Sequence, residues 1–164
     1  MTTVSFTGHR PNKLGGYKIP NPIYSACYGA IHDALLYLKT DKAISGMALG
    51  VDTWGAQNCI DLDIPFVAAV PFKGQESIWP KESQDTYNTL LSAAEHIEYI
   101  CEPGYQAWKL QQRNKWMVDN SDIVLAVFDG TPGGTKNCID YALLNNKKVL
   151  KIDPIKDFLF DWYE

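Results

Sequence analysis

Short apolar runs alternate with longer stretches of helical periodicity along almost the whole chain, and this alternation constrains the fold more than any other feature. Several runs are continuously apolar, which is typical of parallel strands covered by helices on both faces. Strands and helices that alternate in this way form parallel sheets with right-handed crossovers. The predicted strands are Val4–Thr7, Ala43–Ser45, Phe66–Val70, Ile97–Cys101, Ile123–Phe128 and Val149–Ile152.

The clearest helical pattern places apolar residues at positions i, i+3, i+4 and i+7 over residues 23–38. Further helices are predicted to begin near Val51, Asp85, Tyr105 and Gly134. Neither an internal repeat nor an interdomain linker interrupts the pattern. We therefore predict an α/β fold, a Rossmann-like three-layer α/β/α domain with a mostly parallel sheet of five or more strands, over residues 1–164.

The composition limits the classes of partner. A chain of 164 residues with 46% hydrophobic residues can bury a sizeable core without disulfides or metals. The four cysteines are widely spaced and form no CxxC motif, so we expect reduced thiols, no metal and no cofactor. Strand-like sequence begins at Val4 and no apolar run approaches a membrane span, so we expect a cytoplasmic protein with no membrane partner.

The charge pattern points away from long nucleic acids. The net charge is -4, and no basic cluster of the kind that releases counterions from a polyanion is visible. A small anionic ligand needs only a local site and remains compatible with this composition.

Glycine-rich loops follow three of the predicted strands. In open α/β sheets, ligands bind outside the carboxyl ends of the strands, which is where these loops lie. Glycine allows the backbone to approach a ligand closely, and free N–H groups at a helix start bind anions. The segments at the carboxyl ends of the strands are Thr7–Arg10, Ser45–Asp52, Pro71–Lys73 and Asp129–Thr135, and all of them except Pro71–Lys73 contain glycine.

Single residues in these loops allow two interpretations each. Arg10 is a candidate phosphate ligand or a surface ion-pair partner. His9 is a candidate general acid or phosphate contact, or a loop histidine bonded to the backbone. Asp52 suits a ribose hydroxyl or a helix cap. Trp79 is a candidate for stacking on a base or for anchoring its loop, and Cys138 is a reactive thiol or a packing residue.

Four segments resemble the YpsA-like proteins of the SLOG superfamily, which is named for DNA-processing protein A and the Lonely Guy phosphoribohydrolases. They are Thr7–Tyr17, Ser45–Asp52, Arg113 with Asp119–Asp122, and Gly133–Thr135. The resemblance spans roughly residues 3–150. It implies a Rossmann-like fold with a nucleotide-type ligand. Some members cleave the N-glycosidic bond of nucleoside monophosphates, others bind single-stranded DNA, and others sense NAD-derived signals.

One departure from the superfamily pattern bears on catalysis. The phosphoribohydrolases carry a Pro-Gly-Gly-x-Gly-Thr-x-x-Glu loop whose glutamate works with an upstream arginine, for which Arg113 is the candidate. Three residues past Thr135, this chain has Cys138 instead of that glutamate. We therefore expect a binder without catalysis, a sensor or sequestering protein for an ADP-ribose-like, NAD-derived or cyclic nucleotide. The alternative is a phosphoribohydrolase in which Arg113, Asp52 or Asp140 replaces the glutamate.

The resemblance also implies a homodimer or larger assembly, for which the aromatic-rich segment Tyr105–Trp116 offers apolar surface. No catalytic residue is assigned. The candidate nucleotide-binding residues are Thr7, Gly8, His9, Arg10, Ser45, Gly46, Gly50, Asp52, Pro71, Lys73, Trp79, Arg113, Asp129, Gly133, Gly134 and Thr135.

Overall fold

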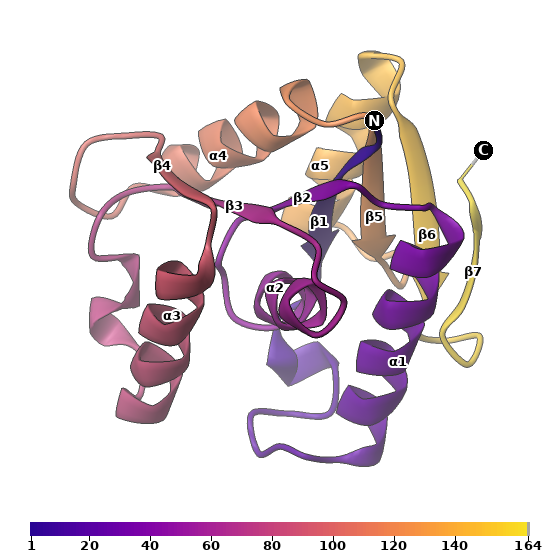
Figure 1. Cartoon of the computed structure of the whole chain (residues 1–164), viewed down its shortest axis with the longest axis horizontal. Coiled ribbons are helices and arrows are strands. Elements are labelled where there is room, and N and C mark those ends of the chain that lie inside the picture. The colour runs from indigo at the N-terminus through magenta and orange to yellow at the C-terminus, as the bar shows by residue number, and fades with distance from the viewer. Residues whose placement is uncertain (164) are drawn as a thin grey trace.

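The computed structural model describes residues 1–163, which fold around a 7-stranded sheet in the order β4-β3-β2-β1-β5-β6-β7 (Figure 1). Strands β1 to β6 are parallel, and β7 is antiparallel to β6. The strands are β1 (Thr3–Gly8), β2 (Lys42–Ser45), β3 (Phe66–Val70), β4 (His96–Tyr99), β5 (Ile123–Val127), β6 (Lys148–Asp153) and β7 (Leu159–Trp162). The α-helices are α1 (Pro22–Tyr37), α2 (Val51–Asp61), α3 (Lys81–Ala93), α4 (Ala107–Asp119) and α5 (Gly134–Leu144), with 3-10 turns at Pro11–Lys13 and Gln75–Ile78.

The helices cover both faces of the sheet, which confirms the predicted Rossmann-like three-layer architecture. In Figure 1, α1, α2 and α3 lie on one side of the strands and α4 and α5 on the other. Strand residues alternate between the two cores: Leu125 packs with the first group of helices, whereas Val124 packs with α4 and α5. Because both of their faces are buried, the inner strands β3 and β5 read as continuous apolar runs.

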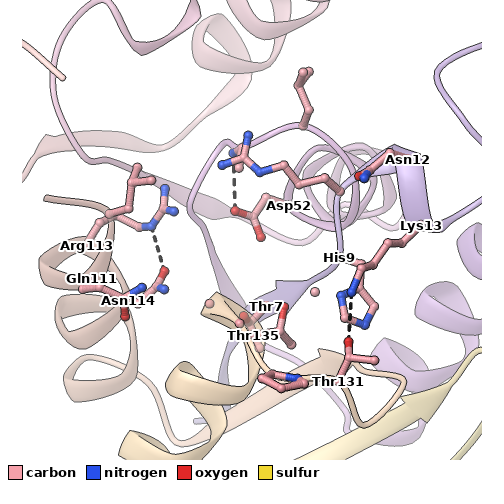
Figure 2. Close-up of a pocket in the computed structure, with 18 residues that line it drawn as sticks. Thr7, His9, Asn12, Lys13, Asp52, Gln111, Arg113, Asn114, Thr131 and Thr135 are labelled. Atoms are coloured by element: carbon pink, nitrogen blue, oxygen red, sulfur yellow. Dashed lines mark hydrogen bonds between the residues drawn. The ribbon is translucent and has the colours of Figure 1, made fainter. Parts of the chain in front are cut away.

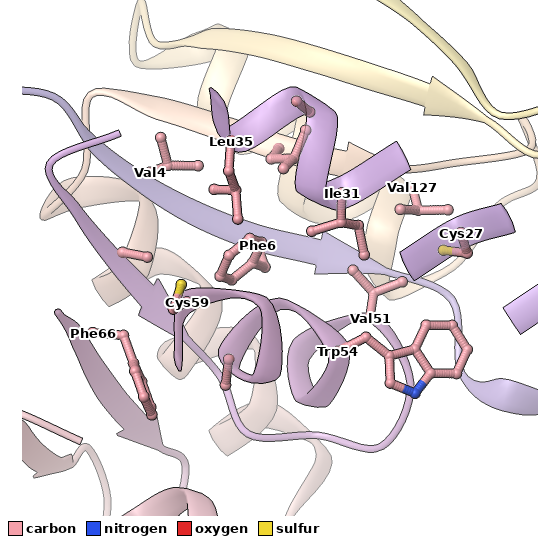
Figure 3. Close-up of a cluster of buried hydrophobic side chains, with 14 of the residues drawn as sticks. Val4, Phe6, Cys27, Ile31, Leu35, Val51, Trp54, Cys59, Phe66 and Val127 are labelled. Carbon is pink, nitrogen blue, oxygen red and sulfur yellow. The ribbon is translucent and has the colours of Figure 1, made fainter. Parts of the chain in front are cut away.

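Helix α2 packs unusually close to the central strand. Figure 3 shows Phe6 of β1 between α1 and α2, surrounded by Ile31, Val51 and Trp54. A Cβ at Gly55 would lie 2.7 Å from the Phe6 ring, so only glycine allows this approach. This packing fixes the start of α2 against the carboxyl end of β1.

All six predicted strands are present, with small differences at their ends, but β7 was not predicted. Its residues alternate between exposed and half-buried, and Leu159 is 70% exposed. The strand is held by contacts between distant segments, because Phe160 packs on Tyr37 of α1 with ring centroids 5.4 Å apart. Such an edge strand has no local apolar signature.

The strand order reverses at the centre of the sheet. Strand β1 has β2 on one side and β5 on the other. Strands β2 to β4 extend the sheet on the first side of β1, and strands β5 to β7 extend it on the second side. Sheets of this class bind ligands in the crevice that opens at such a switch point. Over residues 1–163, no helix is long and apolar enough to cross a membrane.

Candidate functional site

A pocket of about 370 Å³ opens at the carboxyl ends of β1 and β5, at the switch point of the sheet (Figure 2). Its walls come from the loop after β1, the segment that leads into α2, the middle of α4 and the loop before α5. The lining residues are Thr7, Gly8, His9, Arg10, Asn12, Lys13, Ala48, Leu49, Asp52, Leu110, Gln111, Arg113, Asn114, Thr131, Pro132, Gly133, Gly134 and Thr135.

Two helices begin at this pocket, and a glycine precedes each of them. Gly50 before α2 has φ +91, and Gly133 before α5 has φ +146, so both occupy backbone conformations that favour glycine. A Cβ at Gly50 would lie 2.6 Å from the His9 carbonyl oxygen, so this glycine also allows the two loops to touch. The first N–H groups of each helix have no acceptor within the helix.

The two helix starts differ in charge. Helix α2 carries Asp52 in its first turn, and the Asp52 carboxylate accepts a hydrogen bond from the Ala48 amide at 3.3 Å. Helix α5 has no acidic residue in its first turn and instead places Thr135 there. Because Asp52 already neutralises the start of α2, the start of α5 is the stronger site for an anion.

Arg113 of α4 is buried beside Asp52. Its Nε donates to the Asn114 side-chain oxygen at 3.0 Å, and a terminal nitrogen donates to the Gly46 carbonyl. A Cβ at Gly46 would lie 2.7 Å from an Asp52 oxygen and 2.8 Å from the guanidinium carbon, so Gly46 leaves room for both groups. The side chain is 4% exposed and still lines the pocket.

Burial acts on both charges of this pair. It lowers the pKa of Arg113, and the neighbouring Asp52 opposes that effect. Burial likewise raises the pKa of Asp52, and Arg113 and Arg10 oppose it. Each group therefore depends on the other to remain charged in a site with little water.

His9 joins the loop after β1 to the loop after β5. Its Nε2 lies 3.1 Å from the Asp129 amide and 2.9 Å from an Asp129 carboxylate oxygen. Burial lowers the pKa of His9, and the neighbouring Asp129 carboxylate opposes that effect. Burial opposes ionisation of Asp129, but hydrogen bonds from Thr131 and the charges of His9 and Lys13 bring its pKa to about 2. This arrangement corresponds to the loop-bracing interpretation of His9.

The candidate residues fall into three groups. Thr7, Gly8, His9, Arg10, Asp52, Arg113, Gly133, Gly134 and Thr135 line the pocket. The second group lies behind the residues that line the pocket and supports them: Ser45, Gly46, Gly50 and Asp129. The Ser45 hydroxyl, for example, donates to the Asp52 carbonyl at 2.7 Å. Pro71, Lys73 and Trp79 follow β3 and are absent from the lining.

The last group is used elsewhere in the fold. Trp79 packs edge-on against Tyr87, with ring centroids 5.4 Å apart, which matches its interpretation as a loop anchor. Lys73 lines a different cavity beside Trp108 and Lys109.

Sequence reasoning missed several residues of the pocket. Gln111 and Asn114 flank Arg113 on α4, and their helical spacing of three residues places both on the side that faces the pocket. Lys13 lies within the motif that resembles the family, and its Nζ donates to Thr131 at 2.9 Å, which connects the two loops. The helical spacing around Arg113 was the available signal.

Cys138 occupies the sequence position of the absent glutamate. Cys138 is 4% exposed and packs among apolar residues, and burial raises the pKa of its thiol to about 11, which supports a packing role. Asp140 pairs with Lys136 at 2.8 Å and does not line the pocket. Within residues 1–163, Asp52 is the one carboxylate among the lining residues, and no cluster of three or more His, Cys, Asp or Glu side chains suits a metal.

Comparison with known proteins gives relatives of similar length. A UPF0398 protein of Bacillus cereus (strain B4264) is 29% identical over 153 residues, covering 87% of this chain and 83% of the relative. The SPbeta prophage-derived protein YoqJ of Bacillus subtilis is 34% identical over 118 residues, covering 62% of this chain and 68% of the relative.

Solved structures share the fold at low identity. DNA processing protein A from Streptococcus pneumoniae has a TM-score of 0.68 and 16% identity, and the match covers 92% of this chain but 50% of that protein. The Helicobacter pylori protein, described by its single-stranded DNA binding mode, has a TM-score of 0.64 and 18% identity, with coverage of 95% and 70%. The family model for YpsA, described as the YspA SLOG family, matches residues 4–156. The chain therefore belongs to the YpsA SLOG family.

Proposed function

We propose that the pocket binds the phosphate of a small nucleotide at the start of α5 and that the protein does not convert this ligand. The observation that carries the proposal is the open start of α5, which has no acidic residue in its first turn and faces a pocket that also contains the buried Arg113. Backbone N–H groups at a helix start and an arginine are well suited to phosphate oxygens.

The charge of the lining supports an anion. Arg10, Lys13 and Arg113 line the pocket, and Asp52 is opposed by Arg113 and bonded to the Ala48 amide. The described lining therefore has three Lys and Arg side chains and one carboxylate. This excess is local, and it is compatible with a chain of net charge -4.

Hydroxyl groups add further donors. Figure 2 shows Thr7 and Thr135 close together among the residues that line the pocket. Gly134 stands next to them, and a Cβ there would meet no protein atom closer than 3.9 Å. The space beside Gly134 is thus available to a ligand.

The absent carboxylate supports binding without catalysis. The buried thiol of Cys138 stands where the related hydrolases carry their glutamate, and Asp140 pairs with Lys136 away from the pocket. We propose an ADP-ribose-like, NAD-derived or cyclic nucleotide as the ligand, with sensing or sequestration as the role. The pocket volume of about 370 Å³ is at the small end of ligand sites, which suits a phosphate and sugar.

The position of Asp52 supports a second candidate function, the hydrolysis of a nucleoside monophosphate. Its carboxylate lines the pocket beside Arg113, and burial raises its pKa, as in carboxylic acids that donate protons. Incubation with AMP, NAD and ADP-ribose separates the two functions: thermal stabilisation without released base indicates a binder, and chromatographic detection of free base indicates an enzyme.

Gly134→Val tests the position of the phosphate. The added side chain meets little protein, so the fold should persist, but it occupies the space beside the first turn of α5 and should abolish nucleotide binding in a calorimetric titration. Gly29→Val is the matched control, because a Cβ at Gly29 of α1 also meets no atom within 4 Å. Normal binding by Gly134→Val would place the phosphate elsewhere.

A further inference from the structure

A second pocket, of about 430 Å³, adjoins the first one and shares Leu49 with it. It lies between the loop after the first 3-10 turn, the outer side of α2 and the beginning of α3.

The lining of this second pocket is suited to a flat apolar group. Tyr17, Ile19, Trp54 and Pro80 contribute its aromatic and aliphatic walls. Tyr17 is 58% exposed, so its ring is free to stack on an occupant. Aromatic side chains that stack on nucleobases are typical of nucleotide sites.

Gln57 of α2 adds an unused polar group to this pocket. It lines the pocket, and its Oε1 is buried without a hydrogen-bond partner among residues 1–163. Buried polar atoms are rarely left unpaired, because the loss of hydration is costly. If the Gln57 side chain turns toward the pocket, this oxygen can accept from an N–H donor of an occupant, and the amide NH2 of the same side chain can donate in return.

The wall between the two pockets is thin. The backbone of His9 and Arg10 packs directly on Gly50, where a Cβ would lie 2.6 Å and 3.1 Å from their atoms. Leu49, which precedes Gly50, lines both cavities. A ligand with its phosphate at the start of α5 therefore reaches the second pocket by passing over Leu49.

We propose that the second pocket binds the base of an adenine nucleotide, with Tyr17 stacked on the ring and Gln57 paired with its edge. A glutamine amide forms two hydrogen bonds with the amino group and the adjacent ring nitrogen of adenine. The inference rests on the proposed function, because the phosphate of the same ligand occupies the first pocket.

The test compares AMP with ribose 5-phosphate in calorimetric titrations. The wild type should bind AMP more tightly than ribose 5-phosphate. Gln57→Leu and Tyr17→Ala should each weaken AMP binding by about tenfold, as expected for a lost base pairing or stacking contact, and leave ribose 5-phosphate binding unchanged. Gln112→Leu and Tyr99→Ala, at the separate cavity beside Lys73, are the matched controls.

The outcomes separate the two proposals. If ribose 5-phosphate binds as tightly as AMP, or if both variants bind AMP normally, the base does not occupy the second pocket although the phosphate site stands. If neither compound binds the wild type, the proposed function itself fails for these ligands and this inference fails with it. Thermal melting of each variant, expected within a few degrees of the wild type, verifies the fold.

Discussion

Arg113→Met should destabilise the protein chiefly by leaving the Asp52 carboxylate buried without its main partner. Arg113 is 4% exposed and Asp52 8%, so water screens neither group well. Breaking a buried ion pair costs about 3–5 kcal/mol, and the Arg113 and Asp52 charges attract each other without a direct salt bridge, so this range is an upper bound. Arg10 also lowers the pKa of Asp52 and remains in the variant, so we expect the lower end, about 3 kcal/mol.

Urea denaturation followed by circular dichroism measures this loss. With a slope of about 2 kcal/mol per molar urea, the midpoint should fall by about 1.5 M at pH 7. Asp52 can escape the penalty by binding a proton, so the loss should shrink as the pH is lowered. For the same reason Asp52→Asn in the Arg113→Met background should recover part of the midpoint. A double variant no more stable than Arg113→Met would show that the buried charge is not the cause.

Three further predictions concern the loops and the assembly. Arg10→Ala should weaken binding of the stabilising nucleotide by about ten- to a hundredfold, the loss of one charge-assisted contact, measured by titration calorimetry. The pKa of His9 is lowered from its ordinary value of 6.5 in the folded state, so the unfolded chain binds more protons just below pH 6.5 and stability should fall as the pH drops below 6.5. His9→Asn should make the urea midpoint less sensitive to pH between 7 and about 5; an unchanged dependence would contradict the assignment. We also propose a homodimer through α4, where Trp108 is 56% exposed; sedimentation that shows only an 18.4 kDa species would refute it.

The fold was largely predictable because the strands are buried on both sides. Phe66–Val70 was predicted with the observed bounds, and all its residues are buried. Strand β7 shows the limit of such prediction. Its partner on α1, Tyr37, lies more than a hundred positions away, and Asp161 interrupts its apolar character. The burial of this strand depends on tertiary contacts that no local pattern contains.

The loops of the site were predictable, but their convergence was not. Thr7 and Thr135 come together because β1 and β5 are neighbours in the sheet, and strand order cannot be read from periodicity. Pro71 and Lys73 also follow a strand, β3, but β2 separates that strand from β1. A loop at the correct end of the sheet therefore contributes to the pocket only if its strand borders the switch point.

The two glycine loops of the pocket differ in what their polar groups do, although their sequences suggest the same role. Before α2, the Ser45 hydroxyl donates to the Asp52 carbonyl and accepts from the Met47 amide at 3.2 Å, and the Ala48 amide donates to the Asp52 carboxylate. Before α5, Thr135 lines the pocket and the first turn has no acid. The two amides bonded in the α2 loop are not free for a ligand. The asymmetry therefore favours a phosphate at α5, with the α2 loop acting as the rigid support that holds Arg113 in place through the Gly46 carbonyl.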